Sequence, residues 1–280
     1  MILIADSGSS KTDWRLVEGT KITQYSCKGL NPDFNSSKDI ESEVATTFKN
    51  LPSTSTIKSI YFYGAGCSSD ERNSIVENGL KAIFGAASIE VEHDLLGAAR
   101  AACGNQAGLA GILGTGSNCC LFDGNEISRE YRTGGFVIGD EGGGVDIGKR
   151  IIKAYIEDYL PTELRSVFDK RYNLSVDAIL QKLYKEPQAN RFLASFAKFA
   201  LHHKENTFIS ELIQKAFSAY FKNQVLRYPE AKQLKLNLVG SIAFYFQEHI
   251  RNVGQENGVQ IGTILEKPIS GLTLYHSGLS

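Results

Sequence analysis

The segment Gly134–Arg150, GGFVIGDEGGGVDIGKR, places paired glycines and two adjacent acids immediately before a helical pattern. Glycine allows the main chain to approach a neighbouring molecule closely, and the carboxylate of Asp140 can accept hydrogen bonds from hydroxyl groups. The alternative is a flexible stretch in which Asp140 caps the following helix. The residue types leave both interpretations open, although the glycines give more freedom than a cap needs.

Two short glycine turns lie far apart in the chain but resemble each other. Asp6–Ser10 follows the apolar run ILIA, Gly114–Asn118 follows the apolar run GIL, and a second strand-like segment leaves each turn. Turns of Gly, Ser and Thr expose backbone N–H groups and hydroxyls that can hold an anion. Either turn alone would be explained as a strand reversal. As a pair, they predict two related halves, each presenting a hairpin to a polyphosphate.

Asp6 stands at the end of the first predicted buried strand, where a carboxylate has little structural use. Such a carboxylate can hold the hydration shell of a Mg²⁺ ion that is bound to phosphate. The chain contains neither the GxxxxGK[ST] motif of P-loop proteins nor a GxGxxG sequence that opens a helix after the first strand. The sequence therefore disfavours both a P-loop and a Rossmann nucleotide site.

Asp94, in EVEHDLLGAA, lies at the carboxyl end of a predicted strand and ahead of a helix of small residues. Ligand-binding groups gather at such strand ends in α/β sheets. An Asp in this place is more often an N-cap, but in phosphoryl transfer it could accept the proton of an attacking hydroxyl. We expect His93, its strand neighbour, to point to the opposite face and to be structural.

The segment Gly240–Phe244, GSIAF, follows the apolar strand-like run LNLV. A glycine at a strand-to-helix turn lets a flat ring lie against the backbone. Tight packing of the strand on the helix explains the same glycine equally well.

Hydrophobic periodicity predicts strands alternating with helices at first and a mostly helical region from about residue 145. Strands are predicted at 1–5, 12–19, 21–27, 59–66 and 88–94, and again between 107 and 131. Helices are predicted at 38–51, 71–85, 95–104, 145–160, 175–185, 190–204 and 207–226. Segment 234–250 is predicted to be a strand, a glycine turn and a helix.

The 280-residue chain is 42% hydrophobic and 22% charged with a net charge of −1, which is typical of a soluble globular protein. Nothing in the charge pattern indicates nucleic acid or an anionic membrane as a partner, and no apolar run is long enough to span a bilayer. The N-terminus lacks the basic start of a signal peptide. The five cysteines are scattered without a CxxC pair, so we expect free thiols in a cytoplasmic protein.

Together, these motifs resemble those of the sugar kinase/Hsp70/actin superfamily, and within it those of the N-acetylglucosamine kinases and the wider BadF/BadG/BcrA/BcrD ATPase group. DSGSSKTDW is similar to the family's DGGGTKT element, GTGSNC followed by Gly134–Gly142 is the most specific match, and GSIA is similar to the adenosine motif. The resemblance implies a two-lobed α/β fold of the ribonuclease H-like, actin-like ATPase type. Such a fold has duplicated mixed sheets flanked by helices and here a largely helical insertion in the second lobe.

The resemblance also implies an ATP-dependent kinase that phosphorylates an amino sugar, with the 6-hydroxyl of N-acetylglucosamine as the favoured acceptor. Asp94 matches the general base, Asp6 would hold Mg²⁺, and the segment around Asp140 becomes a wall of the sugar site. The residues implied to bind sugar are Asn31, Ser117, Asn118, Phe136 and Asp140. Those implied to bind ATP are Gly8, Ser9, Ser10, Lys11, Thr12, Gly114, Thr115, Gly116, Gly240 and Ser241.

The chain departs from the family pattern in several places. Phe136 stands where relatives often have Trp, so an aromatic face remains without the indole donor, and glucosamine or a murein-derived sugar stays open as the substrate. The chain ends at YHSGLS, and we expect it to lack the final helix that relatives pack on the N-terminal lobe. We place the N-terminal lobe at 1–107 and the C-terminal lobe at 108–280.

Two other functions stay open. An ATPase that activates a partner dehydratase would resemble this fold but would use cysteines to share an iron–sulfur cluster across a dimer, and the scattered cysteines disfavour it. A sugar sensor without transfer activity would not need Asp94 and Asp140. The expected partner is a small sugar, and the frequency of dimers among soluble enzymes favours a homodimer.

Overall fold

The computed structural model describes residues 1–8, 10–51 and 53–278. The chain divides into two compact units. Unit 1 comprises Met1–Gln106, Asp123–Ile127 and Lys267–Ser280, and unit 2 comprises Ala107–Phe122 and Ser128–Glu266. The first boundary lies one residue from the predicted one. The division differs from the prediction at the C-terminus, because the chain returns to unit 1 at Lys267.

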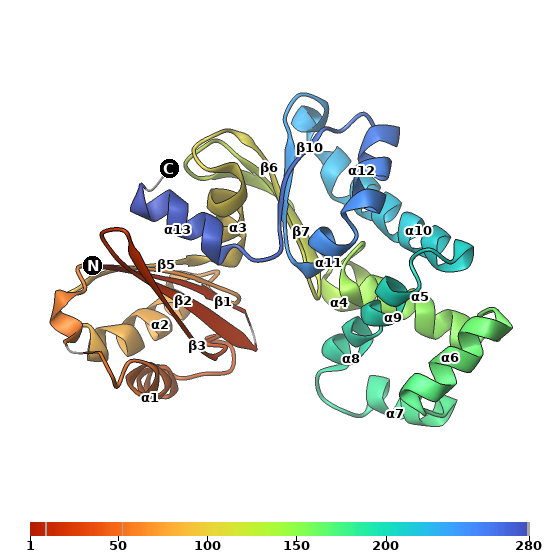
Figure 1. Ribbon diagram of the computed structural model, residues 1–280, viewed down its shortest axis with the longest axis horizontal. Coiled ribbons are helices and arrows are strands. Elements are labelled where there is room, and N and C mark those ends of the chain that lie inside the picture. The colour runs from red at the N-terminus through yellow and green to blue at the C-terminus, as the bar shows by residue number, and fades with distance from the viewer. Residues whose placement is uncertain (9, 52, 279–280) are drawn as a thin grey trace. The chain divides into compact units, whose positions relative to one another are not determined.

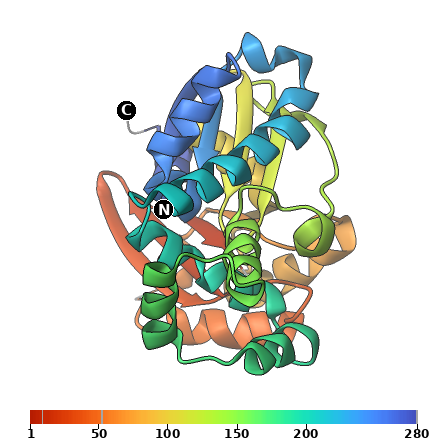
Figure 2. The same cartoon turned by 90° about the vertical axis from the view of Figure 1, so that its right-hand side faces the viewer.

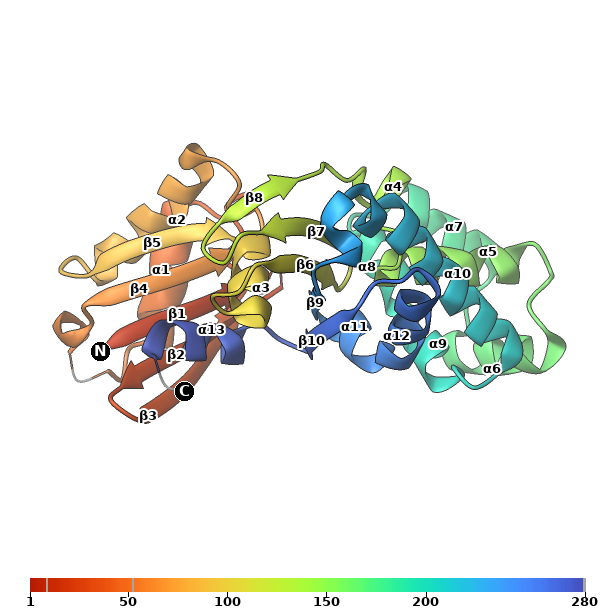
Figure 3. The same ribbon diagram turned by 90° about the horizontal axis from the view of Figure 1, so that it is seen from above.

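Unit 1 is built on a mixed five-stranded sheet of order β3-β2-β1-β4-β5 (Figure 3). The first three strands form an antiparallel meander, and β4 and β5 run parallel to β1. The strands are β1 (Ile2–Ser7), β2 (Lys11–Glu18), β3 (Lys21–Lys28), β4 (Ser59–Gly64) and β5 (Ser88–His93). All five match strands that the sequence predicts.

Helices cover both faces of this sheet. Figure 1 shows α1 (Ser37–Thr47) and α2 (Asp70–Ile83) on one face and α3 (Asp94–Cys103) and α13 (Ile269–Ser277) on the other. A short 3₁₀ turn, η1 (Thr54–Thr56), precedes β4. Helix α1 begins at a capping box, in which Ser36 accepts from the N–H of Asp39 and the Asp39 carboxylate accepts from the N–H of Ser36. The apolar stripes of α1 and α2 then pack on the sheet and bury Trp14 completely.

The C-terminal helix α13 is present, so the expectation that the chain lacks a final helix was wrong. It packs on α3, β1 and β2. A Cβ atom on Gly271 would lie 2.3 Å from the carbonyl oxygen of Ala101, so the two helices touch through their backbones. The short segment is difficult to predict because its apolar residues do not form one stripe: Leu272 is buried while Leu274 is exposed.

A polar network ties the end of α13 to the sheet. The guanidinium of Arg100 donates to the hydroxyl of Tyr63 and to the carboxylate of Glu90, each over 2.7 Å. The Tyr63 hydroxyl lies 2.7 Å from Nε2 of His276, whose ring stacks on Tyr61 at 3.7 Å between centroids. Because Arg100 already donates to the Tyr63 oxygen, the tyrosine proton is left for Nε2. A neutral imidazole of His276 accepts that proton at Nε2 and completes the network.

We expect acid to weaken the folded state through His276. Burial lowers its pKa to about 4, with the charge of Arg100 acting in the same direction and Glu90 against it. At pH values between the ordinary histidine pKa and about 4, the unfolded chain binds a proton at His276 and the folded chain does not. The free energy of unfolding therefore falls as pH decreases through that range. The loss should be roughly 1–3 kcal/mol, because the side chain is only partly buried. Urea unfolding at pH 7 and pH 5 should show a smaller pH effect in His276→Gln; equal pH effects in both proteins would contradict this.

Unit 2 contains a second five-stranded sheet of order β10-β9-β6-β7-β8, which repeats the strand order of unit 1. Strands β6 and β7 are antiparallel like β1 and β2, and β9 runs parallel to β6 as β4 does to β1. The duplication that the two glycine turns predict is therefore confirmed by the topology. The strands are β6 (Gly108–Leu113), β7 (Ser117–Phe122), β8 (Ile127–Glu130), β9 (Leu236–Val239) and β10 (Ile261–Leu265).

The predicted helical insertion lies between β8 and β9 and faces the viewer in Figure 2. Its longest helix, α10, begins at Asn206, whose side chain accepts hydrogen bonds from the N–H groups of Phe208 and Ile209. The insertion comprises α4 (Gly135–Ile138), α5 (Gly144–Ile156), α6 (Thr162–Tyr172), α7 (Val176–Tyr184), α8 (Ala189–Ser195), α9 (Ala197–His202), α10 (Thr207–Asn223), η2 (Val225–Arg227) and η3 (Pro229–Lys232).

Two further helices, α11 (Ser241–Tyr245) and α12 (Gln247–Glu256), follow β9. One continuous hydrophobic core joins the strands of unit 2 to these helices and to the insertion. In the part of the chain that the structure describes, no helix is both long enough and apolar enough to cross a membrane.

Candidate active site

The parallel strands of unit 1 end together and bring three predicted site residues to one edge of the sheet. Ser7 at the end of β1 lies opposite Gly64, which lies opposite His93 at the end of β5. Asp6 and Asp94 therefore share this edge. Asn31 reaches it from the loop after β3, since a Cβ atom on Gly66 would lie 2.4 Å from its Oδ1 atom.

Asp94 is the first residue of α3, and the N-cap position belongs to His93, whose side chain makes no capping hydrogen bond. Nε2 of His93 lies 3.1 Å from Oδ1 of Asp94. The expectation that His93 points away was wrong, because strand alternation stops where the chain turns into the helix. The Asp94 side chain is 32% exposed, so it is an accessible proton acceptor with an imidazole beside it.

Asp6 lies where negative charge accumulates. Burial, followed by repulsion from Asp94 and Asp13, raises the pKa of Asp6 to about 7, while Lys267 partly offsets this. Asp13 faces Asp6 across the β1–β2 pair, and its carboxylate lies 2.6 Å from Nζ of Lys11 and 3.2 Å from Nζ of Lys267. Asp13 and Lys267 were not among the predicted residues, because only the strand pairing and the return of the chain bring them to Asp6.

The first hairpin joins β1 to β2 through a tight turn. The N–H of Gly8 donates to the carbonyl of Lys11 over 2.9 Å, and both Gly8 and Ser10 are exposed. The predicted ligand residue Ser9 lies outside the described residues. Lys11 is 54% exposed although it pairs with Asp13. Gly8, Ser10 and Lys11 thus lie at the surface of the turn, as contact with a phosphate requires.

Thr12 has an internal role instead of the predicted contact with a cofactor. Its side chain is fully buried. Its hydroxyl lies 2.8 Å from the Ser7 hydroxyl and donates to the carbonyl of Lys28 over 3.0 Å. The Ser7 hydroxyl also accepts from the N–H of Leu30. Thr12 therefore holds the base of the hairpin to the start of the Asn31 loop.

Asn31 shapes the loop that carries it. Its side chain is 5% exposed, and Oδ1 accepts from the N–H of Asp33 over 2.8 Å. Its carbonyl accepts from both the main chain and the side chain of Asn35. The predicted sugar residue is thus held rigidly at the edge of the sheet by its own loop.

The second hairpin, Gly114–Gly116, packs directly against the start of α5 in unit 2. The N–H of Gly144 donates to the carbonyl of Gly114 over 2.8 Å, and the N–H of Val145 donates to the carbonyl of Thr115 over 2.9 Å. A Cβ atom on Gly143 would lie 2.7 Å from the carbonyl of Gly116. Gly143 therefore allows the main chain to approach this hairpin closely, whereas the sequence had suggested close approach to a ligand.

Asp140 lies on the second hairpin and is not the cap of α5, since Gly143 holds that position. Its Oδ1 atom accepts from the N–H of Ser117 over 3.3 Å, and a Cβ atom on Gly116 would lie 2.7 Å from its carboxylate. Its φ of 57° is unusual for a residue other than glycine. Burial is the largest cause that raises the pKa of Asp140. The backbone therefore aims this carboxylate at the hairpin.

Ser117 and Asn118 are engaged by other side chains. The Ser117 hydroxyl is buried and accepts from Nε2 of Gln224 over 2.7 Å. The Asn118 side chain donates to Glu130 over 2.9 Å. Gln224 also donates to Glu141 over 3.1 Å. Gln224 supports the site from the end of α10, a role that no local sequence signal could reveal.

Side chains at the end of α10 stabilise the ionised form of Glu141. Burial acts to raise its pKa, but hydrogen bonds from Asn223, from its own main chain and from Gln224 outweigh burial, so the pKa is lowered. The two acids of the DEG sequence thus have opposite environments, because the pKa of Asp140 is raised and that of Glu141 is lowered.

The late glycine turn also lies at the second hairpin. Gly240 has a φ of 124°, and a Cβ atom there would lie 2.2 Å from the carbonyl oxygen of Leu113. Its N–H donates to the carbonyl of Leu265 over 2.9 Å. The next residue, Ser241, is exposed at the start of α11. Gly240 therefore allows close approach to the end of β6 and not, as the packing explanation had it, to the following helix, and it places Ser241 beside the hairpin.

Phe136 lies on the one-turn helix α4, and its side chain is 38% exposed. Its carbonyl accepts a hydrogen bond from Nζ of Lys149 over 3.0 Å. The predicted site residues therefore form two groups, one in each unit. Unit 1 carries Asp6, the first hairpin, Asn31 and Asp94; unit 2 carries the second hairpin, Asp140, Phe136 and the Gly240 turn.

Comparison with known proteins identifies close relatives of this architecture. A candidate N-acetylglucosamine kinase from Porphyromonas gingivalis, known from its crystal structure, is 37% identical over all of this chain and 99% of its own, with a TM-score of 0.94. A second such candidate, from Chromobacterium violaceum, is 17% identical with a TM-score of 0.74 over 98% of each chain, which supports the fold.

A curated relative is the N-acetylmuramic acid/N-acetylglucosamine kinase of Clostridium acetobutylicum, which is 35% identical over 97 residues. That match spans 34% of this chain and about a third, 31%, of the relative. No protein-family model matches the chain. The whole-chain identity to the P. gingivalis protein, on the same two-sheet fold, shows that this chain belongs to the N-acetylglucosamine kinase-like family.

Proposed function

We propose that the chain is an ATP-dependent kinase that phosphorylates an amino sugar, with the 6-hydroxyl of N-acetylglucosamine as the favoured acceptor. The observation that carries this proposal is the similarity over the whole chain to a candidate N-acetylglucosamine kinase. The Asp94 carboxylate, which is 32% exposed and directly follows β5, supports it.

Asp94 is the proposed general base. As the sugar oxygen forms its bond to the γ-phosphorus of ATP, the bond from that phosphorus to the bridging oxygen breaks and ADP leaves. The hydroxyl proton passes to Asp94. Most of the rate acceleration in such reactions comes from positioning and electrostatic stabilisation. The proposed phosphate contacts are the exposed turn residues Gly8, Ser10 and Lys11 and the hairpin Gly114–Gly116.

The surroundings of Asp6 fit a Mg²⁺ ion held through water. Burial, followed by repulsion from Asp94 and Asp13, hinders ionisation of Asp6, and a cation would offset both the burial and the repulsion. Within residues 1–8, 10–51 and 53–278, no three His, Cys, Asp or Glu side chains are grouped as direct metal ligands. When bound, Mg²⁺ would neutralise charge that develops on the phosphates, with Asp6 orienting its water shell.

The sugar hydroxyls are proposed to contact Asp140, whose carboxylate is aimed by its backbone and by Ser117. Asn31 is proposed to add a contact from unit 1. Ser117 contributes its N–H to Asp140 while its hydroxyl is held by Gln224. We therefore propose that Ser117 and Gln224 position Asp140 and that Asn118 lines the same side.

Gly114→Ala tests the second hairpin without disturbing the fold. A Cβ atom on Gly114 would meet nothing within 4 Å, and its φ is not in the left-handed region. We therefore expect thermal stability close to wild type. The added methyl group should keep phosphate away from the backbone and raise KM for ATP about tenfold. Gly240→Ala is the contrasting variant, because it clashes with Leu113 and should unfold at lower temperature. An unchanged KM in Gly114→Ala would remove this hairpin from the ATP site.

A coupled ADP-release assay with MgATP tests the proposed function. The panel should contain N-acetylglucosamine, N-acetylmannosamine, glucosamine, glucose, N-acetylmuramate and no sugar. Strong stimulation by N-acetylglucosamine is the expected result. If another sugar is preferred, Phe136→Trp is the variant to examine. ATP hydrolysis that is indifferent to every sugar would contradict the kinase proposal and favour a dehydratase activator or a sensor.

We further propose that the enzyme works in the cytoplasm as a homodimer. The proposal rests on the ordinary charge balance of the chain and on the frequency of symmetric dimers among soluble enzymes. Light scattering on the purified protein measures the mass in solution directly.

A further inference from the structure

Two lysines from distant parts of the chain meet on one carboxylate in unit 1. Lys11 is the first residue of β2, and Lys267 is the residue at which the chain returns to unit 1 ahead of α13. Nζ of Lys11 lies 2.6 Å from Oδ1 of Asp13, and Nζ of Lys267 donates to Oδ2 of Asp13 over 3.2 Å. The Asp13 side chain is 15% exposed, whereas each lysine side chain is 54% exposed. Asp13 therefore holds both ammonium groups while the lysines stay exposed.

Both ammonium groups keep hydrogen-bonding capacity for an anion. A lysine ammonium has three N–H donors. Within residues 1–8, 10–51 and 53–278, neither Lys11 nor Lys267 forms a salt bridge with an acid other than Asp13. One carboxylate thus holds two cations at the first hairpin, where the carbonyl of Lys11 accepts from the N–H of Gly8 over 2.9 Å.

The strand register places Asp13 beside Asp6. The two residues lie opposite each other on β1 and β2, so their side chains point to the same face of the sheet, and two carboxylates in such a pair repel each other. Burial is the largest cause that raises the pKa of Asp6; repulsion from Asp94 and Asp13 adds to it, and Lys267 acts against it. An acid opposite Asp6 is therefore unfavourable for a site that binds Mg²⁺ and phosphate, unless the cations that this acid holds take part.

We propose that Lys267 is a further phosphate-binding residue of the ATP site, which acts beside Lys11. This role rests on the proposed kinase function. A lysine ammonium binds phosphate oxygens through charge-assisted hydrogen bonds, and two ammonium groups on one carboxylate present neighbouring donors to a chain of phosphates. The sequence EKPIS around Lys267 carries no phosphate-binding motif, because only the return of the chain to unit 1 brings this lysine to Asp13.

Calorimetry with MgADP, in the absence of sugar, tests this role without turnover. We expect Lys267→Gln to weaken MgADP binding about tenfold, the effect of losing one hydrogen bond to a charged group. Lys267→Arg should keep most of the affinity because it keeps the charge. The difference between wild type and Lys267→Gln should shrink as salt increases from about 0.05 to 0.5 M. Adenosine, which carries no phosphate, should show no such difference.

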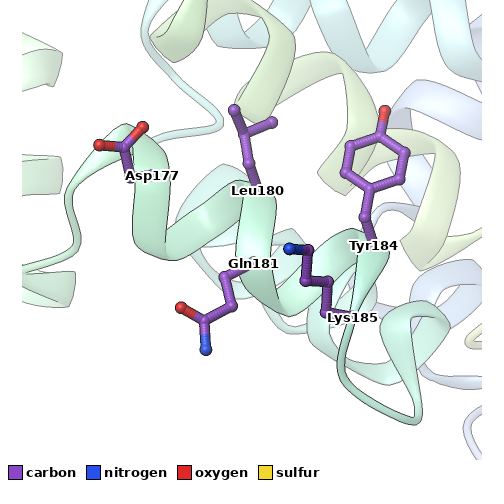
Figure 4. Close-up of a pocket in the computed structure, with 5 residues that line it drawn as sticks. All are labelled: Asp177, Leu180, Gln181, Tyr184 and Lys185. Carbon is purple, nitrogen blue, oxygen red and sulfur yellow. The ribbon is translucent and has the colours of Figure 1, made fainter.

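Two control variants remove the same charge at other places. Lys81 on α2 matches Lys267 in its exposed fraction of 54% and in having one ion pair, which it forms with Glu77. Lys185 directly follows α7 in unit 2 and is among the side chains drawn in Figure 4. Lys81→Gln and Lys185→Gln should both bind MgADP within about twofold of wild type, because salt screens charges that do not contact the ligand.

The outcomes separate this role from the proposed function. An affinity of Lys267→Gln for MgADP within about twofold of wild type, or equal losses in all three glutamine variants, would overturn the role of Lys267. The contact with Asp13 would then only tie β2 to the segment before α13. If wild type binds MgADP through Lys267 but phosphorylates no sugar, the proposed kinase function is wrong and the phosphate contact stands. A wild type that binds no MgADP would contradict both.

Discussion

Asp94→Asn should lower kcat by about 10²–10⁴-fold while sugar affinity stays within a few-fold. The amide has nearly the same shape as the carboxylate but cannot accept the proton of the attacking hydroxyl. Asp94 is the first residue of α3, so the substitution leaves the N-cap residue His93 in place. Steady-state ADP release gives kcat, and calorimetry gives the affinity for sugar.

His93→Gln is the companion variant. It removes the imidazole that lies 3.1 Å from Asp94 but keeps the carboxylate. If His93 only orients the base, kcat should fall much less than in Asp94→Asn, and the pH profile of kcat should shift. A kcat close to wild type in Asp94→Asn would contradict its role as a base, and Asp140 would be the next residue to replace.

Gly148→Ala should cause the largest loss of stability of the substitutions considered. Gly148 is buried in α5, where a Cβ atom would lie 1.9 Å from the carbonyl oxygen of Leu193 and 2.7 Å from its carbonyl carbon. These are backbone atoms of α8 that cannot rotate away, so the two helices must separate. The improved helix propensity of Ala, about 1 kcal/mol, is smaller than the cost of such overpacking. We expect a net loss of about 3 kcal/mol.

Thermal unfolding measures this effect. A loss of this size should lower the midpoint by about 6–12 °C. Gly85→Ala is the matched control, because a Cβ atom on Gly85 lies no closer than 3.4 Å to any atom of its surroundings. Its midpoint should stay within about 2 °C of wild type. If Gly148→Ala unfolds at the wild-type temperature, α5 and α8 are not packed as closely as the structure describes.

The helical insertion shows which helices local sequence patterns can predict and which they cannot. Apolar spacing correctly located α5, α7 and α10, because amphipathic stripes and caps such as Asn206 are local signals. The predicted helix at 190–204 is instead two short helices, α8 and α9, that meet at Phe196. Phe196 is fully buried. At the junction the N–H of Phe196 donates to the carbonyl of Leu193 over 3.1 Å, a turn that periodicity within the segment does not record.

The sequence by itself determined the two glycine hairpins, the duplicated strand pattern and the location of Asp6 and Asp94 at strand ends. Each depends on residues that are neighbours in the chain: an apolar run makes the strand, and the next small or acidic residues make the turn. The order in which the strands pair, which is common to both sheets, also needs contacts between segments far apart in the chain, such as β6 and β9.

Only the tertiary structure decided how the site residues are held. It turned Thr12 inward against the carbonyl of Lys28 and supported Ser117 with Gln224 from 107 positions away. It also returned α13 to unit 1 and brought Nζ of Lys149 to the carbonyl of Phe136. These relations depend on close packing and hydrogen bonds between segments that are distant in the sequence. No local pattern of residue types encodes them, because either partner alone looks like an ordinary helix or loop residue.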